Sequence, residues 1–343
     1  MQISGRSLTS ALFLSAMLAV WTGASVCAAP FTSGNVIVAN GDIVTEYTPA
    51  GSVVQSVPVQ PPNDGSSVLV RDAVIDLSGR LHVMTFEPGT IMMSERAWLS
   101  TFDPLTGGWQ HNTIDGWSLS GVTYYGGLGI SDKYVFAPDL QTGGGEHDGI
   151  IRFPLNDLSS PERFHEVPGY GYDMWHAVKV GLDGYVYALT RGGSPNNLRR
   201  YDPDTMDELA SFGVHKGASV MSVAVDANSD IYTIDLDGDI HHFNGSGTWI
   251  KTVPDAGSAG VDIEIFPDST LLLGSGGGTV TITDTTFSTF STIDTSDADR
   301  GGVFDVDFVA FTAVVPEPST TFALAAFGLL VLGYCGWKRR KRS

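Results

Sequence analysis

The chain has 343 residues, of which 42% are hydrophobic, and 38 acidic residues against 19 basic ones give a formal net charge of −19. So acidic a protein repels phosphate backbones, which excludes nucleic acid as an expected partner and favours an exported protein in an ionic surrounding. Forty-one glycines and 17 prolines, with only 17% charged residues, indicate many turns and little exposed helix, as in an all-β protein.

Residues 1–29 have the organisation of a secretory signal peptide. Arg6 precedes the apolar run "ALFLSAMLAV", and the small residues of "ASVCAAP" suit cleavage by signal peptidase. The apolar run is too short to span a bilayer permanently. Cys27 raises the alternative of a lipoprotein, but Val26 stands before it where lipoproteins usually carry Gly, Ala or Ser. Secretion is therefore the prediction for this end of the chain.

The region between the two ends lacks cysteine, because Cys27 and Cys335 are the only ones and both lie in end segments. Disulfides, a thiol nucleophile and a thiolate zinc site are therefore not expected there. The sequence also shows no serine nucleophile elbow, Walker loop, HExxH motif or dinucleotide fingerprint. Whether the protein is an enzyme stays open at this stage, with a non-catalytic role favoured.

The middle of the chain repeats one unit, which is an apolar strand, a polar turn and a second apolar strand. The five clearest copies are "DAVIDLSGRLHVMT" from Asp72, "GGLGISDKYVFAPD" from Gly126, "HAVKVGLDGYVYALT" from His176, "MSVAVDANSDIYTID" from Met221 and "VDIEIFPDSTLLLG" from Val261. Their equivalent turn positions, Ser78, Ser131, Asp183, Asn228 and Asp268, are 53, 52, 45 and 40 residues apart. Such a period leaves room for four short strands and predicts the blades of a β-propeller.

The two ends of the body supply a sixth unit. The stretch "GGVFDVDFVAF" (residues 301–311) resembles the first strand of a unit, whereas residues 34–57 lack a first strand and otherwise follow residues 238–253 closely. One blade is therefore expected to combine the C-terminal strand with three N-terminal strands, which removes exposed sheet edges. The prediction for residues 30–315 is an all-β, six-bladed β-propeller, with seven blades as the alternative if the long third unit contains a further hairpin.

The phrases "VAVDANSDIYTIDLDGDIHHFN" and "AVKVGLDGYVYALT" resemble the repeats of NHL-type and gluconolactonase-like propellers. The resemblance covers most of the body and implies the propeller fold. It implies no particular activity, because one fold carries many functions.

Three carboxylates on alternate residues, Asp235, Asp237 and Asp239, resemble part of a calcium loop. An EF-hand-type loop also needs a glutamate seven residues after its glycine, and that position after Gly238 is Gly245. The stretch is therefore expected to form a hairpin between second and third strands. Calcium is kept as the weaker alternative, and no other cofactor is expected.

Histidines fall near strands of several units. His241 and His242 are adjacent, so a strand directs them to opposite faces and they cannot share a metal unaided. Convergence of His82, His176 and His241 on the axis is one hypothesis. Packed or hydrogen-bonded histidines are the favoured interpretation.

Three long loops, at residues 87–98, 141–149 and 191–197, each follow the second strand of a unit and should project from the same end of the ring. Loops gathered on a rigid scaffold are a common binding surface. Glu146, His147 and Asp148 are the chemically most capable group among them and form the candidate binding loop. A solvated loop without a ligand is the favoured alternative.

The chain ends in "VPEPST", then an apolar run from Phe322 to Trp337, then a basic cluster. The cluster is Lys338, Arg339, Arg340, Lys341 and Arg342. As a helix the apolar run would measure roughly 24 Å, short of the roughly 30 Å hydrocarbon core. A basic cluster after a span favours a cytoplasmic C-terminus. A plain membrane anchor is one interpretation of these residues.

This end of the chain resembles the PEP-CTERM sorting signal. The resemblance implies that an exosortase processes the exported chain at Pro316, Glu317 and Pro318. It also implies that a short transmembrane helix and the basic cluster hold the chain in the inner membrane only transiently. Members of that family are associated with extracellular polymeric substance and biofilm.

Together these observations divide the chain into a signal peptide (1–29), a propeller (30–315) and a sorting signal (316–343). The leading hypothesis is an exported, non-catalytic propeller at the cell surface or in the extracellular matrix that binds polysaccharide or protein. The main alternative is a secreted lactonase-like hydrolase or lyase with a metal at the propeller axis. A structural surface-layer component is the third.

Overall fold

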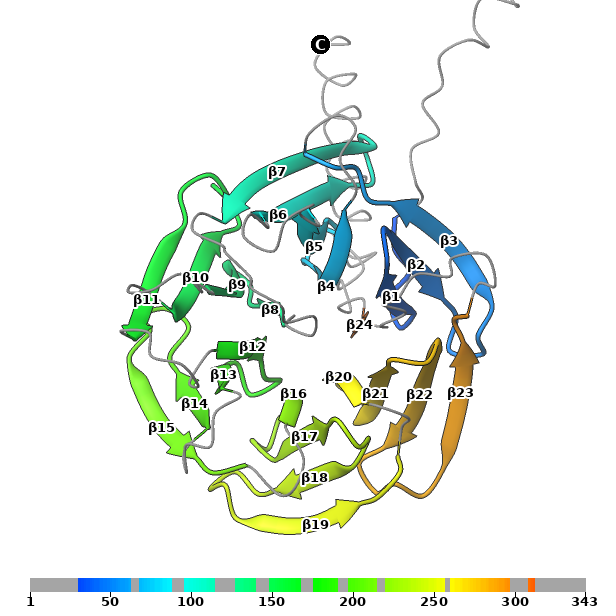
Figure 1. Cartoon of the computed structure of the whole chain (residues 1–343), viewed down its shortest axis with the longest axis vertical. Coiled ribbons are helices and arrows are strands. Elements are labelled where there is room, and N and C mark those ends of the chain that lie inside the picture. The colour runs from blue at the N-terminus through cyan, green and yellow to red at the C-terminus, as the bar shows by residue number, and fades with distance from the viewer. Residues whose placement is uncertain are drawn as a thin grey trace, which may run out of the picture.

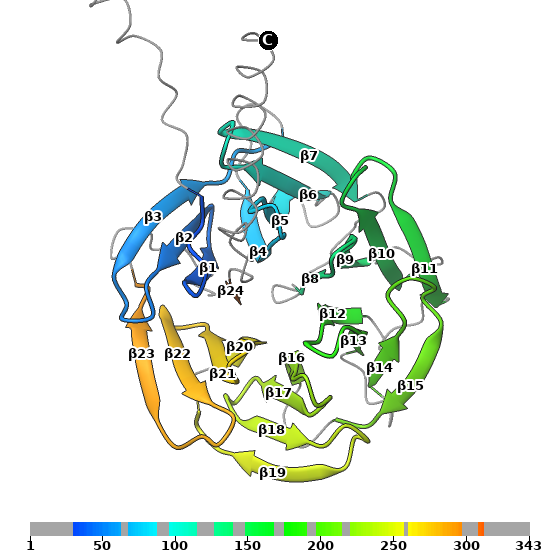
Figure 2. The ribbon, with the colours of Figure 1, turned by 180° about the vertical axis from the view of Figure 1, so that it is seen from behind.

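The computed structural model describes residues 30–62, 68–87, 96–114, 127–139, 148–167, 175–190, 197–214, 220–256, 260–296 and 308–311. In these ranges all regular structure is β, and the strands form six four-stranded sheets. The sheets stand side by side around a central axis (Figures 1 and 2). The all-β fold and the six-bladed propeller are thus confirmed, and the seven-bladed alternative is wrong.

Each blade contains four antiparallel strands, which we count from the axis outward (Figure 1). The innermost strands of blades 1 to 6 are β24 (Phe308–Phe311), β4 (Leu69–Ile75), β8 (Gly129–Ile130), β12 (Trp175–Val180), β16 (Val220–Val225) and β20 (Gly260–Ile265). The second strands are β1 (Val36–Asn40), β5 (Leu81–Glu87), β9 (Tyr134–Asp139), β13 (Val186–Thr190), β17 (Ile231–Asp235) and β21 (Thr270–Ser275). The third strands are β2 (Ile43–Tyr47), β6 (Arg96–Asp103), β10 (Asp148–Pro154), β14 (Leu198–Tyr201), β18 (Ile240–Phe243) and β22 (Thr279–Asp284). The outer strands are β3 (Val53–Pro58), β7 (Gly108–Ile114), β11 (Glu162–Val167), β15 (Glu208–Phe212), β19 (Trp249–Val253) and β23 (Phe290–Asp294).

Blade 1 closes the ring by joining the two ends of the body. Strand β24 pairs with β1 in antiparallel register, from Val36 opposite Phe311 to Ala39 opposite Phe308. The C-terminal strand therefore supplies the innermost position and three N-terminal strands supply the rest, as predicted. The pairing ties residues at opposite ends of the body together, so the ring closes on itself.

The turns between first and second strands share one geometry. In blade 2 the Gly79 N–H donates to the Asp76 carbonyl and the Asp76 N–H donates to the Arg80 carbonyl. The same two bonds recur at residues 181–185, 226–230 and 266–270. The fourth residue of these turns has a left-handed backbone, with φ of 83° at Gly79 and 66° at Ser229. These turns account for the repeated polar pairs of the sequence.

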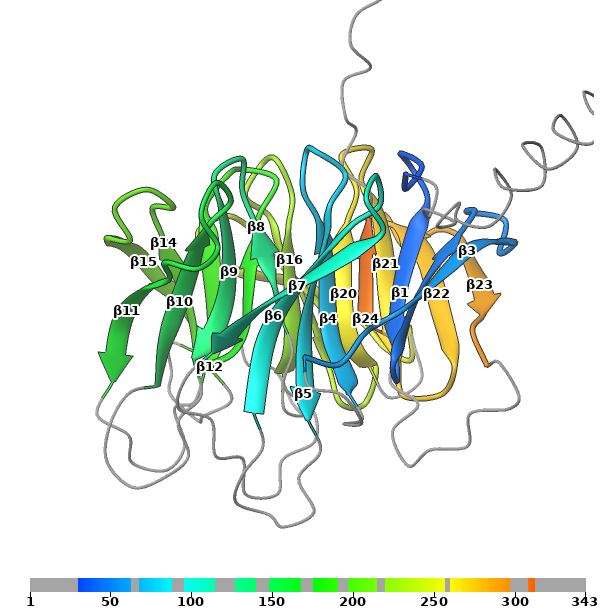
Figure 3. The same ribbon diagram turned by 90° about the horizontal axis from the view of Figure 1, so that it is seen from above.

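The strands alternate in direction, so the first-to-second turns and the third-to-fourth turns gather at one end of the ring (Figure 3). We call this the turn end. Strands β5, β9 and β13 finish at the opposite end, at Glu87, Asp139 and Thr190. The loops predicted to bind a ligand follow these three strands, and their central residues lie outside the described ranges.

The core lies between neighbouring blades. Six clusters of buried hydrophobic side chains fill the six interfaces of the ring. Strand β1 shows how one strand serves two of them: Val36 and Val38 pack against blade 6, whereas Ile37 and Ala39 pack against blade 2. Because side chains alternate along a strand, each inner strand can be apolar on both faces. Charged residues in the innermost strands therefore stand out.

Two glycines bring blades 3 and 4 into close contact near the axis. A Cβ on Gly127 would lie 2.6 Å from Cα of Ala177, and one on Gly129 would lie 2.9 Å from the carbonyl carbon of Lys179. Real side chains do not tolerate such distances to backbone atoms, so only glycine allows β8 to lie against β12 here. The contact holds the backbone on either side of Lys179 in place.

Candidate functional site at the propeller axis

Four innermost strands carry a β-bulge at the same place, after Val70, Trp175, Val220 and Gly260. The paired residues that follow the bulges are equivalent: Asp72, Ala177, Ser222 and Asp262. Two residues further along the same strands come Val74, Lys179, Ala224 and Glu264. Both sets lie on strands that surround the axis, so their charged members can meet across the ring.

Lys179 stands at the centre of this arrangement with its side chain only 4% exposed. Its Nζ donates to Asp72 Oδ2 at 2.9 Å and to Glu264 Oε1 at 2.7 Å, and it lies 3.2 Å from Asp262 Oδ1. One ammonium from blade 4 thus holds carboxylates from blade 2 and blade 6. We call Lys179, Asp72, Asp262 and Glu264 the axial cluster.

The two aspartates accept further hydrogen bonds. Asp72 accepts hydrogen bonds from the N–H groups of Ala73 and Leu128, at 2.7 and 2.5 Å. Asp262 Oδ1 accepts from the Ser222 hydroxyl at 2.6 Å and from the Ile263 N–H at 3.0 Å. The axial cluster therefore joins five of the six blades, because Leu128 belongs to blade 3 and Ser222 to blade 5.

Burial governs the protonation of the axial cluster. It raises the pKa of Asp72 to about 7 and that of Glu264 to about 8, against the attraction of the Lys179 ammonium. Burial alone would lower the pKa of Lys179, but the three carboxylates raise it well above its usual value. Lys179 stays charged, while the carboxylates compete for one positive partner.

This competition predicts a pH-dependent stability. A raised carboxyl pKa contributes stability below the unfolded value, near 4.5 for Glu264, and the contribution is lost as the pH rises towards about 8. Asp72 acts in the same direction. We expect the free energy of unfolding to fall over this range by at most about 1.4 kcal/mol per pH unit for each proton.

Urea unfolding at a series of pH values measures this effect. The Glu264→Gln variant removes one titrating group while keeping a similar shape, so its profile should be flatter than that of the unsubstituted protein. Parallel profiles would show that Glu264 does not titrate in this range and would contradict the prediction.

A pocket of about 480 Å³ opens above the axial cluster at the turn end. Blades 1, 2, 3, 4 and 6 contribute to its lining. Leu77, Ile130 and Leu182 are among its apolar wall residues, and Asp132 lines it on the turn of blade 3. Glu264 belongs to both structures, because it lines the pocket and also binds Lys179. It therefore forms the polar floor.

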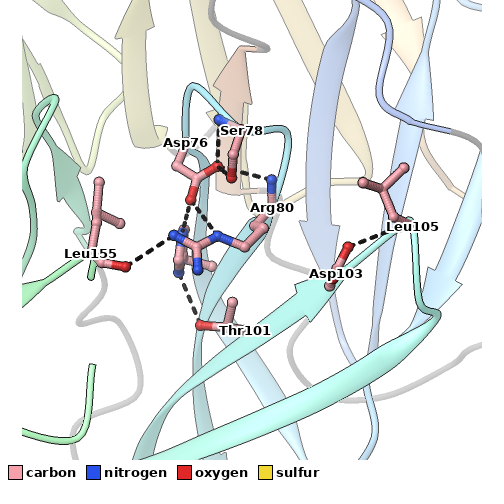
Figure 4. A network of polar contacts seen from close by, with 8 residues as sticks. Asp76, Ser78, Arg80, Thr101, Asp103, Leu105 and Leu155 are labelled. Carbon is pink, nitrogen blue, oxygen red and sulfur yellow. Dashed lines mark hydrogen bonds and ion pairs between the residues drawn. The ribbon is translucent and has the colours of Figure 1, made fainter. Parts of the chain in front are cut away.

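Asp76 also lines the pocket, but its carboxylate is engaged in a local network (Figure 4). Its oxygens accept from Ser78, from the Arg80 N–H and from Arg80 Nε, and they face His82 Nε2 at 3.1 Å. Burial alone would raise the pKa of Asp76, but these hydrogen bonds lower it below its usual range. Arg80 continues to the Leu155 carbonyl in blade 3, so the network braces the rim of the pocket.

His82 and His241 make hydrogen bonds within their own blades. Burial lowers the pKa of His82, whose neutral ring can donate to Asp76 while Nδ1 accepts from the Thr101 hydroxyl at 2.9 Å. His241 makes the same pair of contacts, with Asp235 and Thr252. His82 and His241 therefore lie inside blades 2 and 5 and do not meet at the axis. The side chain of His176 lies outside the described residues.

Asp235, Asp237 and Asp239 form the predicted hairpin, between β17 and β18. Asp235 Oδ1 accepts the N–H groups of Asp237 and Asp239, and Asp239 Oδ1 accepts that of Asp255. Within the described ranges no group of three or more His, Cys, Asp or Glu residues is arranged to hold a metal ion. Calcium at this hairpin stays a prediction.

The candidate binding loop lies almost entirely outside the described residues. Glu146 and His147 lie outside the described residues, and Asp148 is described only as the first residue of β10. The strand ends that flank this loop lie opposite the turn end. The pocket that the structure forms from described residues is therefore at the other end of the ring from the loops that the sequence favoured.

Comparison with known proteins adds one specific finding. A family model described as the PEP-CTERM protein-sorting motif matches residues 314–341. The C-terminus carries a PEP-CTERM sorting motif. This motif implies export that depends on an exosortase, with a cell-surface or extracellular destination. Pro316–Pro318 and the basic cluster at 338–342 fall within or beside the match but outside the described residues.

Other comparisons concern the body of the chain. Apo AztD from Citrobacter koseri is 11% identical, over 80% of this chain and 96% of its own, with a TM-score of 0.45. A chain of the mitotic checkpoint complex is 18% identical over 78% and 76%, with a TM-score of 0.49, and U3-55K is 14% identical over 76% and 77%, with a TM-score of 0.47. No curated protein matches the chain. The fold itself rests on the strand pairings described above.

The membrane segment expected in the PEP-CTERM tail is not part of the described ranges. In those ranges no helix has the length and apolar character needed to cross a bilayer. The signal peptide at residues 1–29 likewise lies outside them and stays a prediction.

Sequence reasoning missed the axial cluster, although a signal for it was present. The repeats align Asp72 with Asp262 and Lys179 with Glu264, and these charges interrupt strands that are otherwise apolar. In an innermost strand that is covered on both faces, alternate charged positions indicate side chains that point to the axis. The pattern becomes visible when the innermost strands of all blades are aligned together.

Proposed function

We propose that this protein is an exported, non-catalytic propeller that binds polysaccharide or protein at the cell surface or in the extracellular matrix. The observation that carries the proposal is the pocket at the turn end, which is set in a closed and rigid ring. Its size of about 480 Å³ lies in the range of ligand sites. The sorting motif supports the location, and the resemblance it carries supports a role in extracellular polymeric substance.

The axial cluster favours this role over the metal-dependent alternative. A hydrolase or lyase with an axial metal needs several carboxylate or imidazole groups free to coordinate it. Here Asp72, Asp262 and Glu264 converge, but the Lys179 ammonium lies among them and forms an ion pair with each. The arrangement braces the ring, because the ammonium occupies the place between the carboxylates that a metal ion would need.

A binding screen tests the proposal. The full chain, purified in a neutral detergent, is presented to purified extracellular glycans and matrix proteins from the producing cells, with and without calcium. Leu77→Lys places a charge on the pocket wall, and Leu105→Lys places the same charge on another turn of blade 2, outside the pocket lining. Both leucines are exposed, at 52% and 72%, so neither change should disturb folding.

The expected result is binding by the unsubstituted protein and by Leu105→Lys, and weaker binding by Leu77→Lys. Equal binding by all three would move the ligand site away from the pocket, and binding to none of the glycans or matrix proteins would contradict the proposed function. Lactone hydrolysis that requires an added divalent metal would favour the enzymatic alternative instead.

A further inference from the structure

The floor of the pocket has more negative than positive groups. Three carboxylates of the axial cluster share the single Lys179 ammonium. Asp72 and Asp262 are fully buried, whereas the Glu264 side chain is 14% exposed and lines the pocket. Glu264 is thus the member through which the surplus of negative charge reaches the pocket.

Among the described residues, one of the two carboxylate oxygens of Glu264 has a partner. Oε1 accepts the bond from Lys179, and within the described part of the chain no hydrogen bond or ion pair reaches Oε2. The Glu264 side chain is 14% exposed and lines the pocket, so Oε2 is open to water or to a ligand there. It is the acceptor that the pocket floor offers to a donor from outside.

The residues that line the pocket walls indicate the chemistry of the ligand beyond the group that binds Glu264. Leu77, Leu128, Ile130 and Leu182 provide apolar surface, and no lysine, arginine or histidine lines the described pocket. Asp132 adds a further carboxylate on an exposed turn. Apolar walls favour a carbon frame, and carboxylates in a described lining without a basic residue favour a positive charge on it.

We propose that the pocket binds a primary ammonium group carried on an apolar carbon frame, with the ammonium on Glu264. This inference rests on the proposed function, because it names the chemistry of the ligand group that enters the same pocket. Lys179 shows the chemistry in place, since its own ammonium is held by this carboxylate at 2.7 Å. A ligand ammonium would occupy the other side of Glu264 and complete its hydrogen bonding.

Neutral and anionic ligands of the same shape should be discriminated against. A hydroxyl in place of the ammonium keeps the apolar contacts but loses the charge-assisted bond to Glu264. A carboxylate in that place would face a surplus of negative charge and be repelled. Charge therefore decides the selectivity of the pocket, and shape adds to it.

Binding should strengthen with pH below the pKa of the ligand. The groups that face Glu264 are Lys179 of β12, Asp262 of β20 and Asp72 of β4. Burial raises the pKa of Glu264 to about 8, so the carboxyl group is mostly protonated at neutral pH and mostly ionised above about pH 8. A cation favours the ionised form, which becomes more populated between about pH 6 and about pH 9.

Benzylammonium is a suitable probe, with benzyl alcohol and benzoate as controls of matched shape. Binding to the full chain in neutral detergent is measured by calorimetry or by ligand-detected NMR, with detergent alone as the blank. Benzylammonium should bind about tenfold more tightly than benzyl alcohol, and benzoate should not bind. Glu264→Gln should weaken benzylammonium about tenfold and leave benzyl alcohol unchanged.

A second pair of variants makes the test independent of whether the Glu264→Gln variant folds. Leu77→Lys adds a positive charge to the pocket wall and should weaken benzylammonium more than benzyl alcohol, whereas Leu105→Lys should change neither. Equal affinities for benzylammonium and benzyl alcohol, or a Leu77→Lys protein that binds benzylammonium as before, would overturn the inference. Neither outcome depends on a substitution at Glu264.

The two proposals fail in different ways. If benzylammonium binds as expected but no glycan or matrix protein does, the proposed function fails and the ammonium site remains. If glycans or proteins bind and are weakened by Leu77→Lys while benzylammonium does not bind, the ligand enters through other chemistry and the inference on the ammonium group is wrong.

Discussion

Lys179→Met is expected to lower the free energy of unfolding by about 3–5 kcal/mol, the usual effect of removing one partner from a buried ion pair. Methionine fills a similar volume but leaves Asp72, Asp262 and Glu264 facing one another without a cation. Two of these carboxylates already have pKa values raised by burial. Without Lys179 they must take up protons or repel one another, and either outcome destabilises the closed ring.

Chemical denaturation monitored by tryptophan fluorescence measures the change. Lys133→Met is the matched control, because Lys133 pairs with Asp204 on the surface, where both side chains are more than half exposed. That substitution should leave stability nearly unchanged, because exposed ion pairs contribute little.

The pH gives a second check on Lys179→Met. Its deficit should shrink in acid, because protonated carboxyls no longer need a cation. A deficit that is independent of pH would attribute the loss to packing rather than to charge and would contradict the role given to Lys179.

The propeller could be predicted because its information is local and repeated. Each hairpin joins residues a few positions apart, and turn residues such as Gly79 and Gly184 mark the same place in successive units. The closure was also predictable, since residues 34–57 visibly lack a first strand and "GGVFDVDFVAF" supplies one. Repetition lets one well-understood unit determine the others.

The site was harder to predict because its contacts are not local. Lys179 lies 107 positions from Asp72 and 85 from Glu264 in the sequence, and only the closed ring brings them together. Pattern reasoning assigned chemical roles to exposed polar loops, for which Glu146 and Asp148 were candidates. The charged residues that meet in the structure are instead buried within strands, where a sequence pattern predicts packing and gives no partner.

The axial cluster also supports the pocket from below. Buried carboxylates and an ammonium lie next to Glu264, and the Asp76 network braces the rim of the pocket. The buried polar side chains therefore stabilise the ring only together, since each one supplies a hydrogen-bond or ion-pair partner for another. A site supported in this way keeps its geometry before a ligand arrives, which lowers the entropic cost of binding.

Replacing Pro316, Glu317 and Pro318 by alanine is expected to change the fate of the chain from release to retention in the membrane fraction. The match to the PEP-CTERM motif covers these residues, and the resemblance assigns them to processing by an exosortase. Without the motif the apolar run and the basic cluster that follow should hold the unprocessed chain in the inner membrane. Immunoblots of membrane, surface and medium fractions measure both the location and the length of the product.

Ser319→Ala is the matched control, because it alters a neighbouring residue and leaves the motif intact. Unchanged release of the triple-alanine variant would contradict the sorting hypothesis.

Processing at the motif should leave the propeller intact, because the closing strand β24 ends at Phe311, before the motif begins. Cleavage at the motif would therefore leave the β24–β1 pairing, the axial cluster and the pocket in the released part. Retention and release would differ in where the pocket is presented, and the pocket itself should bind the same probe in both forms.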